Sequence, residues 1–151
     1  MAVGTSAVCY SFMQEVLVGE HNFTAGATGD QFKIALYTNS STISASSTVY
    51  VTSGETTNTA GTAYTGGGED LTSVTPALKS STTACCDFSD VSWSTASFTA
   101  YGALIYNDDT TGDKAVCVLN FGGDKTASAG TFTIQFPDFT AAAAILRLAN
   151  A

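Results

Sequence analysis

The chain has 151 residues, of which 44% are hydrophobic and 12% are charged, and its net charge is −8 at neutral pH. This length and hydrophobic content predict one ordered domain over residues 1–151, with a surface built mainly from Ser, Thr, Gly and Asn. The five basic residues are scattered along the chain. The composition therefore argues against a nucleic-acid partner and excludes an anionic membrane surface, since both need clustered cations.

A short helix is expected first, over about residues 8–18, with Ser6 as its N-cap and Gly19 at its end. We expect its apolar stripe to cover the core of the domain and not to bind a partner's groove. The first residues show no signal peptide and no apolar run long enough to span a membrane, so we expect synthesis in a host cytoplasm. The stripe consists of Cys9, Phe12, Met13, Val16 and Leu17.

The first strong strand is predicted over residues 32–38, where alternate apolar residues share one face. Residues 39–70 follow as a long loop region rich in Ser, Thr and Gly, in which only residues 49–51 indicate a short strand. A loop of this length in a compact domain is usually functional, or disordered until it binds a partner.

Further strands are predicted over residues 71–78, 82–88, 101–106, 115–121 and 131–136, with a bend at Ser89 and Asp90. The turn at residues 107–113 joins two of these runs into a hairpin. The tail over residues 141–149 combines helix-forming alanines with an apolar run, and we expect a short terminal strand there. The pattern predicts an all-β fold, a mostly antiparallel β-sandwich or jelly roll of about seven to nine strands with one short N-terminal helix.

The side chains expected between the two sheets are the apolar residues that alternate along these strands. Truncating Phe132 or Phe136 to Ala is predicted to cost about 3–5 kcal/mol of stability. The expected core consists of Phe32, Ile34, Leu36, Phe88, Trp93, Leu104, Tyr106, Val118, Phe132, Ile134 and Phe136.

No catalytic, cofactor-binding or metal-binding residue is expected. His21 is the only histidine and is assigned a surface or capping role, because no Ser or Cys motif accompanies it. The glycines at 66–68 precede acidic residues and lack the cation that a phosphate loop needs. Cys9, Cys85, Cys86 and Cys117 do not have metal-site or redox spacing, so we interpret them as small apolar fillers.

Two groups of carboxylates are candidate sites. Asp108, Asp109 and Asp113 share one turn and could bind calcium, but their spacing is not that of an EF-hand, and aspartates are common in turns. Asp87 and Asp90 could form the carboxylate pair of a glycoside hydrolase, although the sequence does not indicate the aromatic-lined cleft that such an enzyme requires.

Four strand-and-turn motifs carry a family resemblance, and they lie at residues 32–38, 64–67, 102–107 and 121–126. With these motifs the chain resembles a family of small tailed-phage virion proteins, which act as capsid cement or decoration proteins where a role is assigned. The resemblance extends from about the helix to the C-terminus. Cys85 and Cys86 stand where an aliphatic pair is more typical.

The resemblance implies a bacteriophage structural protein that binds the outside of the major capsid shell and stabilises it, on the virion surface. Multivalent docking favours a homo-oligomer, either a trimer or a dimer, because linked weak contacts add avidity. Residues 39–70 and the N-terminal region are the expected contacts with the major capsid protein. Two alternatives remain open: a tail, head–tail or receptor-binding β-sandwich module, and a carbohydrate-active enzyme that uses Asp87 and Asp90. We expect no enzymatic activity and no cofactor.

Overall fold

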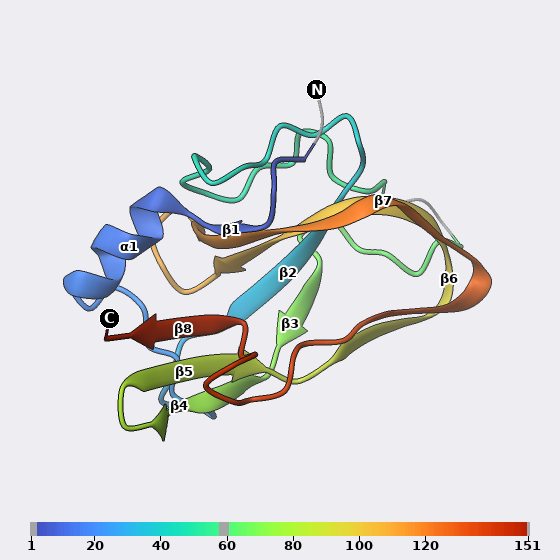
Figure 1. Cartoon of the computed structure of the whole chain (residues 1–151). Helices are drawn as coiled ribbons and strands as arrows, with labels where there is room; N and C mark the ends of the chain where they lie inside the picture. Colours follow the sequence, from blue (N-terminus) through green and yellow to red (C-terminus); the bar gives the residue numbers. More distant parts are fainter. Residues whose placement is uncertain (1–2, 58–60, 151) are drawn as a thin grey trace.

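Two antiparallel sheets and one short helix make up the computed structural model, which describes residues 3–57 and 61–150 (Figure 1). This confirms the predicted all-β sandwich with a short N-terminal helix. The larger sheet has the order β1-β7-β6-β2-β3 and the smaller sheet the order β4-β5-β8. In chain order the elements are β1 (Ala7–Val8), α1 (Tyr10–Leu17), β2 (Phe32–Tyr37), β3 (Glu69–Leu71), β4 (Ser73–Ser80), β5 (Thr83–Phe88), β6 (Val91–Asn107), β7 (Lys114–Ile134) and β8 (Leu146–Ala149).

The hairpin of β6 and β7 is the largest element and is bent back on itself (Figure 1). The sequence predicted the turn of this hairpin correctly but divided each long strand into separate short runs. Four shifts of register interrupt the ladder between β6 and β7. Residues with positive φ lie in this region, including Thr95, Gly122 and Ala129. Such irregularities bend the strands and increase their local twist, so the continuous hairpin can fold back on itself within the larger sheet.

Nine of the eleven residues predicted to form the core are buried. Phe132 and Phe136 are only partly buried, and they pack against the outer side of the cluster. Their partial burial lowers the stability cost that we expect from truncating them to Ala. The bend of β7 leaves one side of the sandwich open, and both rings lie there. Phe32 is instead the centre of an aromatic cluster, with ring centroids 4.3 Å from Phe23 and 5.6 Å from Phe88.

The helix α1 was placed correctly, but its role in the core was predicted wrongly. Only Phe12 of the helix is buried, together with Cys9 just before it. Met13 and Leu17 are 53% and 86% exposed. The N-cap position is Cys9 and not Ser6, whose hydroxyl oxygen instead accepts the backbone N–H of Asn120. The helix therefore covers the core with one edge only.

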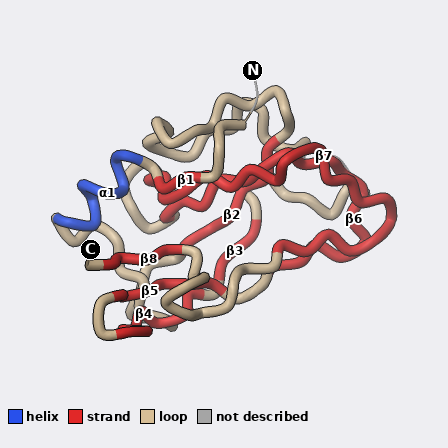
Figure 2. Tube along the Cα trace, in the orientation of Figure 1, coloured by secondary structure: helices blue, strands red, loops and turns tan. Residues whose placement is uncertain are grey.

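The long connection between β2 and β3 is nearly all loop, yet it packs against the protein (Figure 2). Backbone hydrogen bonds join it to the N-terminal segment, to β2 and to the start of β7. The Glu55 carboxylate accepts hydrogen bonds from the hydroxyls of Tyr50 and Tyr64, both at 2.6 Å, and from the N–H of Gly67 at 2.7 Å. Burial, followed by the bond to Glu55, raises the pKa of both tyrosines. The described part of this segment is thus a fixed layer, contrary to its disordered appearance in the sequence.

The cysteines have the packing role that the sequence predicted. Cys9, Cys85 and Cys117 are buried, Cys86 is partly buried, and all four are free thiols. Burial raises the pKa of Cys9 and of Cys86 to about 11, so both thiols stay protonated at neutral pH. Among the described residues, no helix has the length and apolar character needed to cross a membrane.

Candidate functional site

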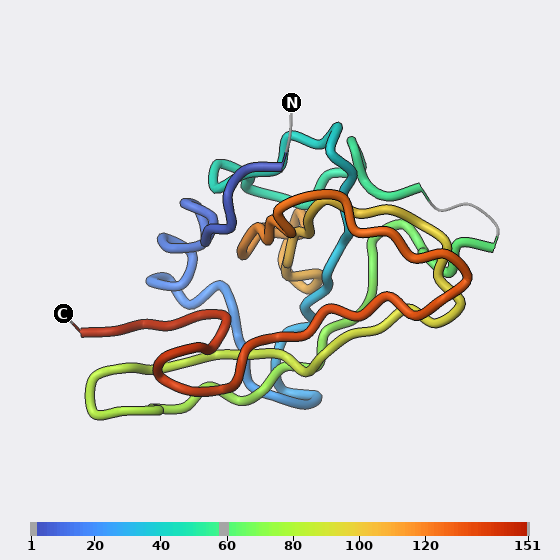
Figure 3. The backbone as a smooth tube through the Cα atoms, turned by 45° about the vertical axis from the view of Figure 1, so that its right-hand side comes forward, coloured from blue at the N-terminus to red at the C-terminus, as the bar shows by residue number. Residues whose placement is uncertain are grey.

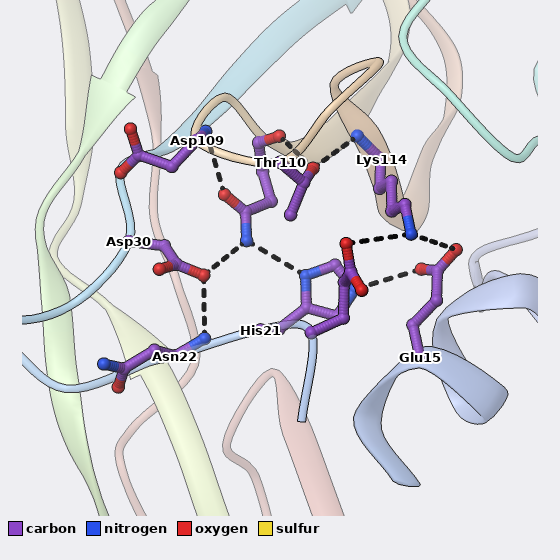
Figure 4. Close-up of polar contacts among 9 residues, drawn as sticks. Glu15, His21, Asn22, Asp30, Asp109, Thr110 and Lys114 are labelled. Carbon is purple, nitrogen blue, oxygen red and sulfur yellow. Dashed lines mark hydrogen bonds and ion pairs between the residues drawn. The ribbon is translucent and has the colours of Figure 1, made fainter. Parts of the chain in front are cut away.

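The most extensive polar cluster surrounds His21, whose side chain is fully buried (Figure 4). Its Nε2 lies 3.0 Å from Glu15 Oε2 and its Nδ1 lies 3.0 Å from Asn107 Nδ2. The orientation of the Asn107 amide is fixed, because its nitrogen also donates to Asp30 and its oxygen accepts the backbone N–H of Asp109. His21 Nδ1 therefore accepts a hydrogen bond, and Nε2–H donates to Glu15.

This cluster joins α1 to the turn between β6 and β7. Lys114, the first residue of β7, lies 3.0 Å from Glu20 and 3.9 Å from Glu15. Within the described residues, no hydroxyl or thiol hydrogen-bonds the His21 ring. Both ring nitrogens are already engaged by side chains that position the ring, so the arrangement lacks the nucleophile of a catalytic triad. We interpret the cluster as a buried set of hydrogen bonds and ion pairs that holds α1 against the turn before β7. The surface role predicted for His21 does not fit the burial of its side chain.

The aspartates of the 107–113 turn have separate partners and do not converge on one point. Asp109 accepts the backbone N–H of Gln31 at 2.6 Å, and Asp108 lies 3.9 Å from Lys33. Asp113 has a positive φ of 53° and belongs to the turn itself. No group of three or more acidic, histidine or cysteine side chains with metal-binding geometry occurs in the described chain.

The other candidate pair consists of Asp87 and Asp90, which differ in burial. Asp87 is 2% exposed, and its Oδ1 accepts the N–H of Phe88, whereas its Oδ2 has no partner among the described residues. Asp90 is exposed and accepts the backbone N–H of Phe136. A glycosidase needs both carboxylates to face the same sugar. These two do not face one open cleft.

Asp87 makes the stability of the fold depend on pH. Burial raises the pKa of the Asp87 carboxyl in the folded protein. The stability that this carboxyl contributes is therefore fully present below its ordinary pKa, and it is lost as the pH rises through the raised pKa. We therefore expect Asp87→Asn to gain stability relative to the wild type as the pH rises from 4 towards 8. Urea denaturation of both proteins across this range measures the effect, with the exposed Asp124→Asn as control. Parallel curves for wild type and Asp87→Asn would contradict the prediction.

Exposed apolar side chains gather on α1 and just beyond it. Glu15 is the single acidic residue of α1, and it is turned inward to His21 and Lys114. The outward side of the helix therefore carries no charge, and apart from the exposed Gln14 it is apolar, in a protein whose net charge is −8. Patches of this kind mark interaction sites when they are contiguous. We call this patch the helix surface, and it consists of Tyr10, Met13, Val16, Leu17 and Val18.

The helix surface was not predicted, because the apolar residues of the helix were assigned to a single stripe that faces the core. Tyr10, Met13 and Leu17 follow one another at helical spacing and form a second stripe beside that of Cys9 and Phe12. Two stripes on a helix of eight residues present more apolar surface than one side of a core can cover. The helical spacing of Tyr10, Met13 and Leu17 is the pattern from which an exposed apolar surface could have been predicted.

A second candidate is the groove of about 750 Å³ between the two limbs of the bent strand β7. Phe121, Phe132 and Phe136 contribute partly buried rings to it, and Asp124 and Lys125 line its rim. A groove that combines apolar rings with a few polar groups has the general character of a binding site. The rings that the sequence assigned to the core therefore lie in the groove.

The chain was compared with protein-family models, curated proteins and solved structures, and none of them matches it. Its function must therefore be inferred from the two surfaces and from the chemistry of its residues.

Proposed function

We propose that the chain is a bacteriophage virion protein that decorates the outside of the capsid and stabilises the shell. The resemblance noted in the sequence supplies the capsid as the partner. The observation that carries the proposal is the helix surface, because an adhesive protein needs an exposed apolar patch on a rigid support. Leu17 and Val18 are 86% and 72% exposed, and the helix beneath them is held by Glu15, His21 and Lys114.

The helix surface suits a partner that is also a protein. Apolar contacts at the centre of an interface provide most of its affinity, whereas exposed charges are screened by salt. A contact through Tyr10, Met13 and Leu17 should therefore survive high salt and be weakened by mild denaturant. In this proposal several copies act together on the shell, so that weak single contacts gain avidity.

A second candidate function is a tail or receptor-binding module, and the groove on β7 favours it. Its partly buried rings and polar rim would suit a receptor segment or a glycan better than a flat capsid surface. Leu17 lies outside this groove, so the two functions predict different sensitivities to mutation.

The variant Leu17→Asp tests the proposed function. It places a charge at the centre of the helix surface and should weaken binding to capsid shells at least tenfold, because the charge would be desolvated in the interface. The fold should be unaffected, since Leu17 is almost fully exposed. Ser128→Asp adds the same charge at the exposed bend of β7, away from α1, and is the matched control (Figure 1). Co-sedimentation with stripped shells measures binding, and equal binding of both variants would contradict the proposal.

A further inference from the structure

The small sheet ends in an open edge at β8. Among the residues that the structure describes, this strand pairs with β5 only, through the partners Ala84 and Leu148 and their neighbours. The N–H of Asn150 donates to the carbonyl of Thr82. Backbone groups alternate in direction along a strand, so those of Leu148 point to β5, while those of Arg147 and Ala149 point to the open side. Two residues of β8 therefore present free donors and acceptors.

The other three sheet edges carry features that oppose the addition of a strand. β1 has two residues, and β3 has three, including Glu69 and Asp70. β4 contains Pro76 and Lys79, and its register shifts twice against β5. Short length, charge, proline and bulges are the ordinary means by which proteins protect their edges. β8 has only Arg147, whose guanidinium donates to its own chain at Ala142 O, 2.8 Å away.

The face of the small sheet next to this edge is apolar. Leu78, Ala84 and Leu148 stand in one row across its three strands, and both leucines are about three-quarters exposed. Along β5 the same face leads to Phe88, which packs into the core. Figures 1 and 3 both place α1 on the β8 side of this sheet, away from β5. A strand added to β8 would extend the row towards the helix.

We propose that β8 accepts an extended segment of the capsid subunit as a fourth strand of the small sheet. This inference rests on the proposed function and gives its mode of contact, which is β-augmentation. The outward-pointing backbone groups of Arg147 and Ala149 match the hydrogen-bonding pattern of an added strand. The row ending at Leu148 requires apolar residues at alternate positions of that strand. The net charge of −8 favours basic residues beside them, by charge complementarity.

The variant Ala149→Pro tests the mode of contact. Proline removes an N–H that points outward and leaves the bonds between β8 and β5 in place. We expect at least tenfold weaker binding to stripped capsid shells and an unchanged thermal transition of the free protein. Ala149→Ser keeps the N–H and should bind like the wild type. On shells, hydrogen exchange at the amides of Arg147 and Ala149 should slow in the wild type.

The outcomes separate the inference from the function. If the wild type binds and Ala149→Pro binds equally well, the strand mode is overturned while the capsid function stands. If Ala149→Ser is weakened as much as Ala149→Pro, the side chain and not the N–H matters, and the inference also fails. If Ala149→Pro abolishes self-association of the free protein but not shell binding, the edge pairs with a second copy and the inference is overturned. A wild type that does not bind shells overturns both proposals.

Discussion

Phe32→Ala should lower the free energy of unfolding by about 3–5 kcal/mol, the range for a large aromatic side chain removed from a packed core. Phe32 is fully buried on β2, and its ring stacks on Phe23 with an interplanar angle of 12°. It also contacts Phe88, so its loss opens a cavity where the small sheet meets the large one. Urea denaturation followed by circular dichroism measures the change.

Phe136→Ala provides the matched comparison, because it removes the same side chain from a partly buried position. Its ring is 5.7 Å from Phe88 and lines the groove on β7. We expect a loss of about 1–2 kcal/mol, smaller because the site is open to water. Equal losses at Phe32 and Phe136 would contradict the assignment of the core.

The second large effect is expected at Gly68, in the turn before β3. Gly68 has a φ of +80°, and a Cβ built there would overlap the carbonyl oxygen of Ile34 on β2. Gly68→Ala should therefore cost about 3–5 kcal/mol, from the unfavourable φ and from the displaced strand. Because β3 pairs with β2 at Ile34, the edge of the larger sheet should loosen.

Gly67→Ala separates these two causes. Gly67 has a φ of +91°, yet the nearest atom to its Cβ would be the Tyr106 hydroxyl oxygen at 3.5 Å, an ordinary contact. This variant should lose only about 1–2 kcal/mol, the cost of the left-handed backbone alone. Thermal denaturation of both variants gives the comparison, and equal losses would show that the contact with Ile34 is unimportant.

The sequence predicted those elements whose signal is local. Alternation at Phe32, Ile34 and Leu36 correctly indicated β2, and the turn residues correctly indicated the hairpin of β6 and β7. The continuity and bend of that hairpin were missed, because they depend on bulges near Gly122 and Ala129 that no short pattern reports. The order of residues 39–57 and 61–70 was missed because it depends on side-chain hydrogen bonds from Tyr50 and Tyr64 to Glu55, which no alternation of apolar residues reports.

The surfaces were harder to predict than the fold. Burial of His21 between Glu15 and Asn107 depends on Asn107, which lies 86 positions from His21 in the sequence. Exposure of Leu17 depends on how α1 sits against β7, and a stripe of apolar residues alone does not determine which side faces the core. The open edge at β8 follows from strand order, which alternation does not specify.

The copy number of the protein on the virion tests the central claim most directly. Quantitative mass spectrometry of purified particles gives its ratio to the major capsid protein. A decoration protein that covers the shell should be present in numbers comparable to the capsid subunits, and should be retained in high salt through its apolar helix surface. A few copies per particle, released together with the tail, or absence from the particle would contradict the proposal.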